Sequence, residues 1–234
     1  RLLGAARGRR VRRERDPALD ERRLGTDPDE PGQTGTLHWE SNPREGAAPV
    51  RYAVFGSDEK GFTANREPHN SWKRGEVPGN LVGETEGTSM VVIGPGAEGD
   101  NTNHVYYRVV AIDADGTESG NSNYAEAPHP LIVSAPMTEA TVGAEYRYEV
   151  RATRSLGDVQ NRTNPVDRSY DYRFWDTEEL TWELAEGPQW LAIDAETGAL
   201  TGTPPAAGRF PVKIALSTQS DDRAEQVFEI SVRD

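Results

Sequence analysis

Pairs of carboxylates stand at several predicted turns, and these pairs are the first candidates for chemistry. Asp113 and Asp115 precede one glycine, and Asp194 and Glu196 precede another. Carboxylate oxygens are the ligands that calcium prefers, so either pair could hold a calcium ion. Aspartate is also an ordinary turn former, because its side chain bonds to the backbone two residues further on. The sequence favours plain turns and keeps calcium as the alternative, and it points to no other cofactor.

Catalysis is not indicated by the spacing of the polar residues. A glycoside hydrolase needs two carboxylates about 5–9 Å apart in a cleft, and the tips of hairpins seldom provide one. Histidines do not stand at metal-ligand spacing. Phosphate loops, nucleophile elbows and dinucleotide fingerprints are absent. The sequence therefore predicts no catalytic residue and no enzyme activity.

Aromatic residues in connecting segments are stronger candidates for binding. Trp72 lies in an irregular stretch, and Tyr170, Tyr172 and Trp175 lie near the end of the segment 154–176. Aromatic faces stack on sugar rings or fill pockets of a partner, and long loops on rigid scaffolds often carry binding. The alternative is that these residues cover a sheet edge or fill a junction between domains.

Composition narrows the choice of partners. The 234 residues carry a net charge of −13, and residues 1–25 hold nine Arg against four acidic residues, so the remainder sums to −18. Such an acidic body repels nucleic acid, which disfavours DNA or RNA as a partner. Cysteine is absent, which excludes disulfides and Cys-ligated metals. An apolar run of about 18 residues is lacking, so we expect no membrane span.

Short alternating runs separated by turn residues predict an all-β fold with almost no helix. The predicted architecture is two tandem antiparallel, immunoglobulin-like β-sandwiches preceded by an extended N-terminal arm. Residues 1–34 are the arm or linker, residues 35–128 the first sandwich and residues 131–234 the second. The stretch 125–130 contains two prolines, which favour a stiff, extended junction.

The most informative stretch, residues 187–204, reads GPQWLAIDAETGALTGTP. It predicts a strand, a tight turn and a second strand that ends at Pro204. With Tyr146-x-Tyr148 upstream, it resembles the putative-immunoglobulin (dystroglycan-type cadherin-like) repeat. This resemblance implies a structural hairpin of a β-sandwich, with Trp190 facing inward. Relative to that family, the segment 154–176 is a long insertion.

The first half resembles a fibronectin type III domain. The matching residues are Leu37-x-Trp39, Tyr52-x-Val54-Phe55 and the hairpin that runs from Tyr106 to Ser119. The resemblance implies that the Trp and the Tyr pack between two sheets. Three features depart from the family: no obvious strand precedes Gly35, residues 62–88 are long and irregular, and the turn 56–62 is distinctive.

These observations predict a non-catalytic structural or binding module pair of a larger secreted or cell-surface bacterial protein. It would dock to other domains or chains of that assembly, or to a glycan, in an extracellular location. Two alternatives stay open. One is the accessory C-terminal portion of a polysaccharide-active enzyme, separated by cleavage near the arginine-rich arm. The other is a calcium-dependent adhesion module. A chain that begins at Arg1 is expected to continue from an upstream segment.

Overall fold

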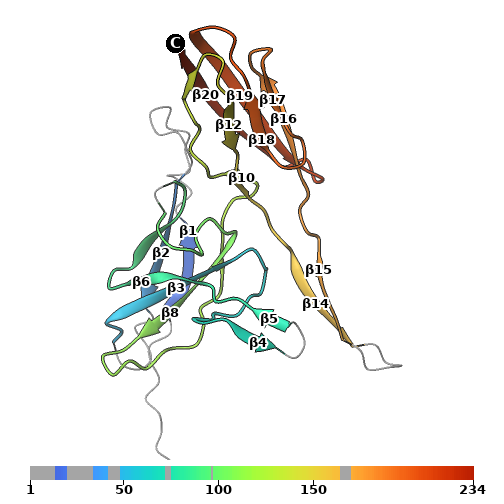
Figure 1. The fold of residues 1–234 in the computed structure, drawn as a ribbon. Coiled ribbons are helices and arrows are strands. Elements are labelled where there is room, and N and C mark those ends of the chain that lie inside the picture. The colour runs from blue at the N-terminus through green and yellow to red at the C-terminus, as the bar shows by residue number, and fades with distance from the viewer. Residues whose placement is uncertain (1–13, 20–33, 42–47, 72–74, 96, 164–169) are drawn as a thin grey trace, which may run out of the picture.

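The computed structural model describes residues 14–19, 34–41, 48–71, 75–95, 97–163 and 170–234. In these residues the regular structure consists of β-strands, which confirms the predicted all-β class. The strands gather in two lobes that meet near strand β10 (Figure 1). Among the described residues, no helix is long and apolar enough to cross a membrane.

The first lobe contains two sheets and a separate hairpin. Strands β1-β2-β7 form a three-stranded sheet, β6-β3-β8-β9 form a four-stranded sheet, and β4 pairs with β5. The strand bounds are β1 Glu14–Leu19, β2 Gly35–Ser41, β3 Arg51–Ser57, β4 His69–Ser71, β5 Gly75–Val77, β6 Leu81–Thr85, β7 Ser89–Ile93, β8 Tyr106–Ile112 and β9 Ala125–Glu126.

The two main sheets of the first lobe enclose an apolar core. Leu37 and Trp39 of β2 meet Tyr52 and Val54 of β3 and Tyr107 of β8 in one cluster of buried side chains. The rings of Trp39 and Tyr52 lie edge to face with centroids 5.4 Å apart, a favourable geometry for aromatic pairs. This packing of a Trp and a Tyr between two sheets is what the fibronectin type III resemblance implies.

The outer face of the four-stranded sheet is covered as well. Ala53 and Phe55 alternate with the core residues of β3 and pack against Phe62 in a second buried cluster. The irregular stretch that begins at residue 62 thus covers this face of the sheet through Phe62. Strand β3 is buried on both sides, which explains why its sequence is a nearly continuous apolar run.

Part of the expected N-terminal arm is a strand of the first lobe. Strand β1 pairs antiparallel with β2, with Glu14 opposite Ser41 and Leu19 opposite Leu37. The register shifts between Arg15 and Ala18, next to a proline that is tolerated on an edge strand. This stretch lacks alternating apolar residues, so the sequence did not reveal it as a strand. The other arm residues lie outside the described part.

The second lobe is built from a four-stranded sheet, a three-stranded sheet and two strand pairs. Their orders are β11-β20-β19-β16, β12-β18-β17, β10-β13 and β14-β15. All these pairings are antiparallel except β11 with β20. The bounds are β10 Leu131–Ile132, β11 Glu139–Thr141, β12 Tyr146–Glu149, β13 Ala152–Thr153, β14 Asp158–Thr163, β15 Tyr170–Trp175, β16 Leu180–Glu186, β17 Leu191–Ile193, β18 Ala199–Gly202, β19 Gly208–Thr218 and β20 Arg223–Arg233.

The motif at 187–204 forms the predicted hairpin, with Leu191 of β17 opposite Gly202 of β18. Trp190 faces inward as predicted: it is partly buried, packs against the buried cluster and lies edge to face with Tyr146 and Phe210. Trp182 of β16 is the more deeply buried tryptophan, at 5% exposure. The ring of Trp182 lies against Gly198, where a Cβ would stand 2.8 Å from an indole carbon. The second glycine of the motif therefore leaves room for a core aromatic ring.

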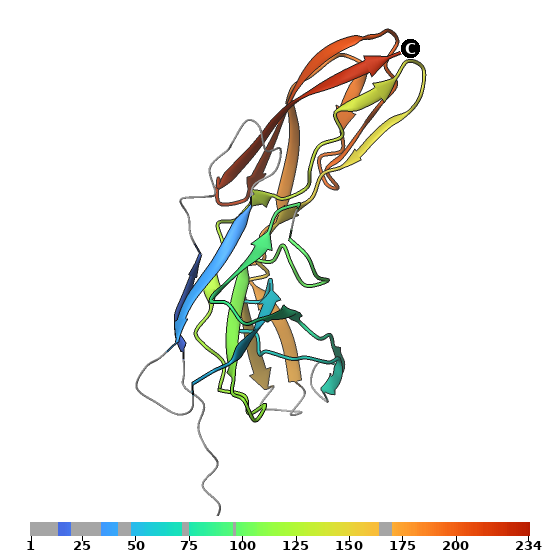
Figure 2. The same cartoon turned by 90° about the vertical axis from the view of Figure 1, so that its left-hand side faces the viewer.

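The segment 154–176, expected as a long insertion, is largely a regular hairpin in its described residues. Strands β14 and β15 pair antiparallel over six residues each, from Asp158 opposite Trp175 to Thr163 opposite Tyr170. Figures 1 and 2 both show this hairpin leaving the second lobe and extending past β10 to the level of the first lobe. The polar sequence of β14 hides its strand pattern, whereas β15 alternates aromatic and charged residues from Tyr170 to Phe174.

Replacing Gly198 with alanine is expected to destabilise the second lobe more than the matched change Gly143→Ala. Both glycines have a positive φ, 74° and 73°, so both variants incur a backbone cost of about 1 kcal/mol. Only the new Cβ at Gly198 meets Trp182, because nothing lies within 4 Å of a Cβ at Gly143. We expect about 1–3 kcal/mol of additional loss from this overpacking, measured by urea denaturation. Equal losses in the two variants would contradict the packing argument.

Candidate functional site at the junction of the two lobes

One short extended segment serves the cores of both lobes. Leu131 and Val133 belong to the buried cluster of the first lobe, whereas Ile132 between them belongs to that of the second. All three are at most 5% exposed. Successive side chains of an extended strand point to opposite sides, so one strand can contribute to two cores. Burying a side chain of this size contributes about 1.5–3 kcal/mol, so the segment ties the lobes together.

A second connection is made by backbone hydrogen bonds between the lobes. The amide of Leu156 donates to the carbonyl of Asp58 at 2.9 Å, and the amide of Lys60 donates to the carbonyl of Gly157 at 3.0 Å. Glu59 and Gly157 form an isolated parallel bridge. The base of the β14–β15 hairpin is thus bonded to the distinctive turn of the first lobe that follows β3.

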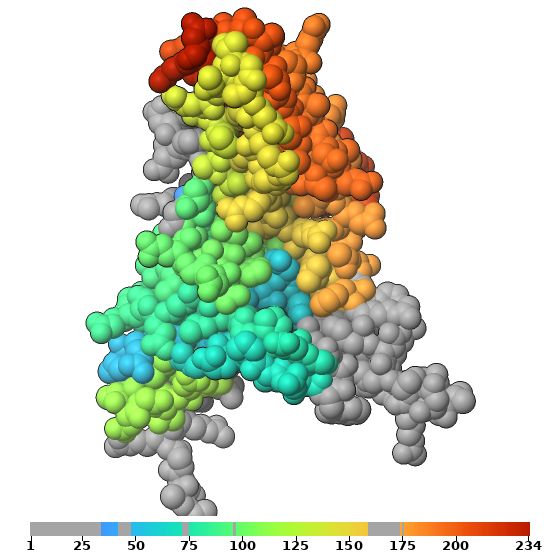
Figure 3. All heavy atoms as spheres, in the orientation of Figure 1, coloured from blue at the N-terminus to red at the C-terminus, as the bar shows by residue number. Residues whose placement is uncertain are grey.

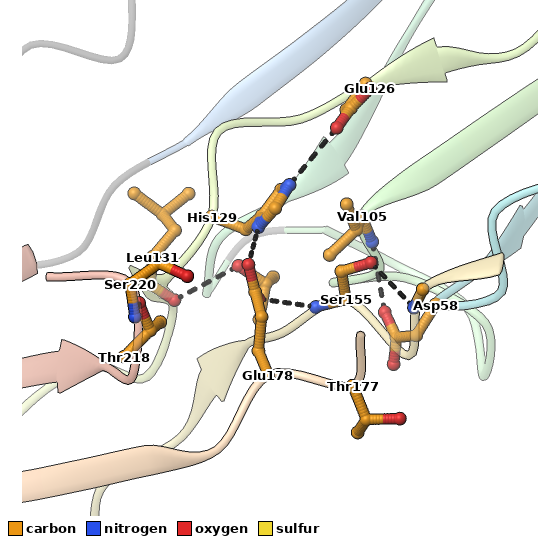
Figure 4. Close-up of polar contacts among 12 residues, drawn as sticks. Asp58, Val105, Glu126, His129, Leu131, Ser155, Thr177, Glu178, Thr218 and Ser220 are labelled. Carbon is orange, nitrogen blue, oxygen red and sulfur yellow. Dashed lines mark hydrogen bonds and ion pairs between the residues drawn. The ribbon is translucent and has the colours of Figure 1, made fainter. Parts of the chain in front are cut away.

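Polar side chains complete the junction, as Figure 4 shows. The hydroxyl groups of Tyr106 and Ser155 lie 2.8 Å apart, and the Ser155 hydroxyl accepts a 2.9 Å bond from the Gly157 amide. One carboxylate oxygen of Glu178 accepts from the Ser155 amide at 2.7 Å, and the other lies 2.5 Å from Nδ1 of His129. Burial raises the pKa of Tyr106 to about 12, so its phenol stays neutral near pH 7.

The set of Ser155, His129 and Glu178 superficially matches a nucleophile–histidine–carboxylate triad. Its connectivity is different. Both polar contacts of the Ser155 hydroxyl are with Tyr106 and Gly157 rather than with the histidine. Nε2 of His129 lies 3.2 Å from a carboxylate oxygen of Glu126, where a triad would have the nucleophile. These groups hold the junction in place and do not form a catalytic arrangement.

A buried network continues the junction into the second lobe. The hydroxyl of Tyr148 donates to the carbonyl of Ser134 at 3.0 Å, and Nε2 of Gln226 donates to the same carbonyl at 2.8 Å. The Ser134 hydroxyl accepts from the amide of Arg151 at 2.9 Å. Buried polar groups are costly unless they are paired, so this network fixes the direction in which the chain leaves β10.

Two cavities flank the junction. One, of about 430 Å³, is lined by Tyr106 and by several residues labelled in Figure 4, among them His129, Ser155 and Glu178. The other, of about 490 Å³, lies between residues 99–103 of the first lobe and residues 150–154 and 180–197 of the second. Both are therefore formed only when the lobes hold their mutual arrangement.

The aromatic residues predicted for binding lie in strand β15 or outside the described residues. Trp72 lies outside the described residues. Tyr170, Tyr172 and Trp175 belong to β15, where the alternation of a strand places positions 170 and 172 on one face and position 175 on the other. A binding role for this hairpin stays a prediction.

The carboxylate pairs predicted for calcium act in turns. Oδ1 of Asp113 accepts the amides of Asp115 and Thr117, both at 2.9 Å. Oδ1 of Asp194 accepts the amides of Glu196 and Thr197 at 3.0 and 2.8 Å. Among the described residues, no group of three or more His, Cys, Asp or Glu is placed to hold a metal ion. Calcium binding stays a prediction, to be tested by melting in calcium and in chelator.

The sequence does not predict the contacts of the junction residues, because their partners are distant in the chain. Glu178 lies 49 positions after His129, and Ser155 lies 49 after Tyr106. The local signal was the proline-framed stretch around His129, which predicted stiffness without naming its contacts. The distinctive turn 56–62 was a second signal, because departures from a family pattern often mark positions with a specific role.

The topology of both lobes, and a family comparison for the second, indicate immunoglobulin-like β-sandwiches. The first lobe packs a three-stranded against a four-stranded sheet, and the second lobe has the strands and turns of an immunoglobulin-like sandwich. Residues 129–233 match the model of the family described as "Putative Ig domain". The match confirms the resemblance of the second half of this chain to that repeat.

Comparison with curated proteins gave no match. Among solved structures, an endo-fucoidan hydrolase from glycoside hydrolase family 107 is 17% identical with a TM-score of 0.28, and the match covers 87% of this chain and 27% of the hydrolase. The protocadherin GammaB4 extracellular domain is 13% identical with a TM-score of 0.31, covering 94% and 33%. The Clostridium thermocellum CbhA fibronectin(III)-like modules are 10% identical with a TM-score of 0.23, covering 86% of both chains. This chain thus spans about a third or less of the first two proteins.

The Asp194 turn is expected to make the second lobe sensitive to acid. Hydrogen bonds from the amide and hydroxyl of Thr197, and from the amide of Glu196, lower the pKa of Asp194 below its ordinary value. A depressed pKa adds stability above the unfolded pKa of about 3.9, and this is lost as the pH falls through the folded pKa. We expect Asp194→Asn to reduce the drop in melting temperature between pH 7 and pH 3. Asp222→Asn is the control, and an equal reduction in it would contradict the assignment.

Proposed function

We propose that this chain is a non-catalytic pair of β-sandwich modules within a larger secreted or cell-surface protein. Its role is to hold two sandwiches at a set mutual orientation, so that neighbouring domains or chains are spaced and docked. The observation that carries this proposal is the alternation of Leu131, Ile132 and Val133 between the two cores. A flexible linker would instead expose polar residues and share none of them with a core.

The remaining contacts at the junction support the same role. Two backbone hydrogen bonds, the Tyr106–Ser155 pair and the Glu178–His129 pair cross between residues of the two lobes or of the segment that joins them. Each hydrogen bond contributes a net free energy of about 1 kcal/mol, and the sum is large enough to make one orientation of the two lobes dominant. The family match supports a structural role, because such sandwiches serve as scaffolds in many proteins.

The spacer role predicts a single, narrow distribution of distances between the lobes. The chain has no native cysteine, so Glu86→Cys and Val227→Cys introduce two unique attachment points for spin labels. Glu86 lies in the first lobe, and Val227 is 71% exposed in the second. Pulsed electron–electron double resonance on the doubly labelled chain is expected to give a distance distribution with one narrow peak. A broad distribution would contradict a fixed orientation.

A matched pair of variants tests which contacts fix the orientation. Glu178→Ala removes the carboxylate that accepts from Ser155 and contacts His129, and we expect a broader distance distribution. Glu179→Ala changes the exposed neighbouring residue and is expected to leave the distribution unchanged. Equal broadening in both variants would show that the junction does not depend on the Glu178 contacts.

The absence of catalysis is tested separately. Incubating the whole chain with a panel of polysaccharides is expected to release no reducing ends above a buffer control. Release that persists through purification and is abolished by Glu178→Gln would overturn the non-catalytic assignment and place an active site at the junction. The same panel tests the alternative of an accessory module, because such a module binds a polysaccharide without cleaving it.

A further inference from the structure

The larger of the two junction cavities has a lining suited to a ligand. Its floor includes Val133, Val150 and Trp182, which are at most 5% exposed as whole residues. Its rim carries Arg151 and Arg154, both exposed. A volume of about 490 Å³ is within the range of small-ligand pockets, about 300–1,000 Å³. On the face shown in Figure 3, the yellow surface around residue 150 borders the green surface around residue 100.

The two arginines of the rim lack carboxylate partners among the described residues, in contrast to several other arginines of the molecule. Arg66 pairs with Glu84 and Glu118, Arg209 pairs with Glu229, and Arg233 pairs with Glu139. In a chain with a net charge of −13, carboxylates are abundant, so an arginine that remains without one is notable. Planar guanidinium groups bind carboxylate and sulfate oxygens through paired hydrogen bonds. The rim therefore offers two free cationic groups to an anion.

Neutral polar groups stand beside the arginines. The hydroxyl of Thr102 donates to the carbonyl of Gly99 at 3.1 Å, and the hydroxyl of Thr197 donates to Oδ1 of Asp194 at 2.9 Å. Each hydroxyl oxygen also accepts one bond, from Nδ2 of Asn103 at 3.3 Å and from the amide of Ala199 at 3.4 Å respectively, and keeps one further lone pair for a ligand. The hydroxyls are thus held in place by the protein and can accept bonds from a hydroxylated ligand. The indole of Trp182 adds an apolar edge.

We propose that this cleft binds a short acidic saccharide, with a carboxylate or sulfate group held by Arg151 and Arg154. The remaining hydroxyl groups of the sugar would bond to the polar rim, and its apolar face would contact the floor beside Trp182. The size of the cleft suits one or two sugar rings, and its polar lining suits a hydroxylated ligand better than an apolar one. This inference goes beyond the spacer role, since a spacer needs no ligand.

Charges of both signs line the cleft, so removing a basic and removing an acidic side chain should change the binding of an anion in opposite directions. Asp100 of the first lobe and Glu196 of the second also line the cleft, and a carboxylate there repels an anionic ligand. Removing an arginine should weaken binding, whereas removing the charge of Asp100 should strengthen it. A nonspecific effect of surface mutation would not produce this pair of results.

Isothermal titration of the whole chain tests the proposal with a trigalacturonate, a sulfated galactose trisaccharide and a neutral galactose trisaccharide. We expect at least one acidic trisaccharide to bind about tenfold or more tightly than the neutral one. Arg151→Gln and Arg154→Gln should each weaken that binding about tenfold, the effect of losing one charged hydrogen-bonding group. Asp100→Asn should strengthen binding a few-fold, and a weakened affinity in this variant would contradict the assignment. Arg209→Gln, which removes an arginine at the start of β19 that is not among the residues lining the cleft, is the matched control and should change nothing.

Several results would overturn the proposal. These are no binding of either acidic trisaccharide, equal binding of the neutral one, equal binding of inorganic sulfate or of an acidic octapeptide, and an equal loss in Arg209→Gln. Melting temperatures of all variants check that folding is retained. If an arginine variant has a lowered melting temperature, a salt titration of the wild type replaces it as the test. Binding of the acidic trisaccharide must weaken as salt screens the arginines, and binding that does not depend on salt rejects the ion pair. The distance measurement on the labelled chain is independent of these outcomes.

Discussion

The arrangement of the molecule depends on a strand that is buried on both sides by different cores. Ile132 packs into the second lobe while Leu131 and Val133 pack into the first, so the lobes cannot separate or rotate freely without exposing apolar surface. Exposure of even one such side chain costs about 1.5–3 kcal/mol. A two-domain chain usually joins its parts through exposed polar residues and moves at that point. Here the junction is continuous with both hydrophobic cores.

Every polar contact at the junction reinforces this constraint. The Asp58–Lys60 turn and the start of the β14–β15 hairpin exchange backbone hydrogen bonds, and Glu178 accepts from the Ser155 amide beside His129. Hydrogen bonds of this kind contribute little alone, because water offers equivalent partners to the open state. Against a junction already closed by apolar packing, they select among the orientations that packing allows. The polar groups set the orientation of the lobes, and burial of the connecting strand supplies the stabilising free energy.

The sequence predicted the features that are local. Residues 187–204 identified a hairpin and its family, because turn residues and alternating apolar positions lie within one short window. It placed Trp190 inward, where the ring packs against the core, whereas the packing of Trp182 against Gly198 joins residues that do not lie within one short window. Strands β1 and β14 were missed because most of their residues are charged or polar, and without β14 the alternation of β15 had no partner strand to pair with. The junction contacts join residues 49 positions apart, which no local pattern encodes.

The spacer role and the proposed saccharide site follow from the same constraint. A cleft between two freely moving lobes would change shape continually, and a ligand that bridges it would lose binding energy to ordering them. With the orientation fixed by Ile132 and its neighbours, the rim that carries Arg151 and Arg154 faces residues 99–103 in advance of binding. The departures from the family patterns, at the turn 56–62 and the segment 154–176, contribute the backbone contacts between the lobes. A junction made rigid by these contacts would supply both the proposed spacing and a preformed cleft.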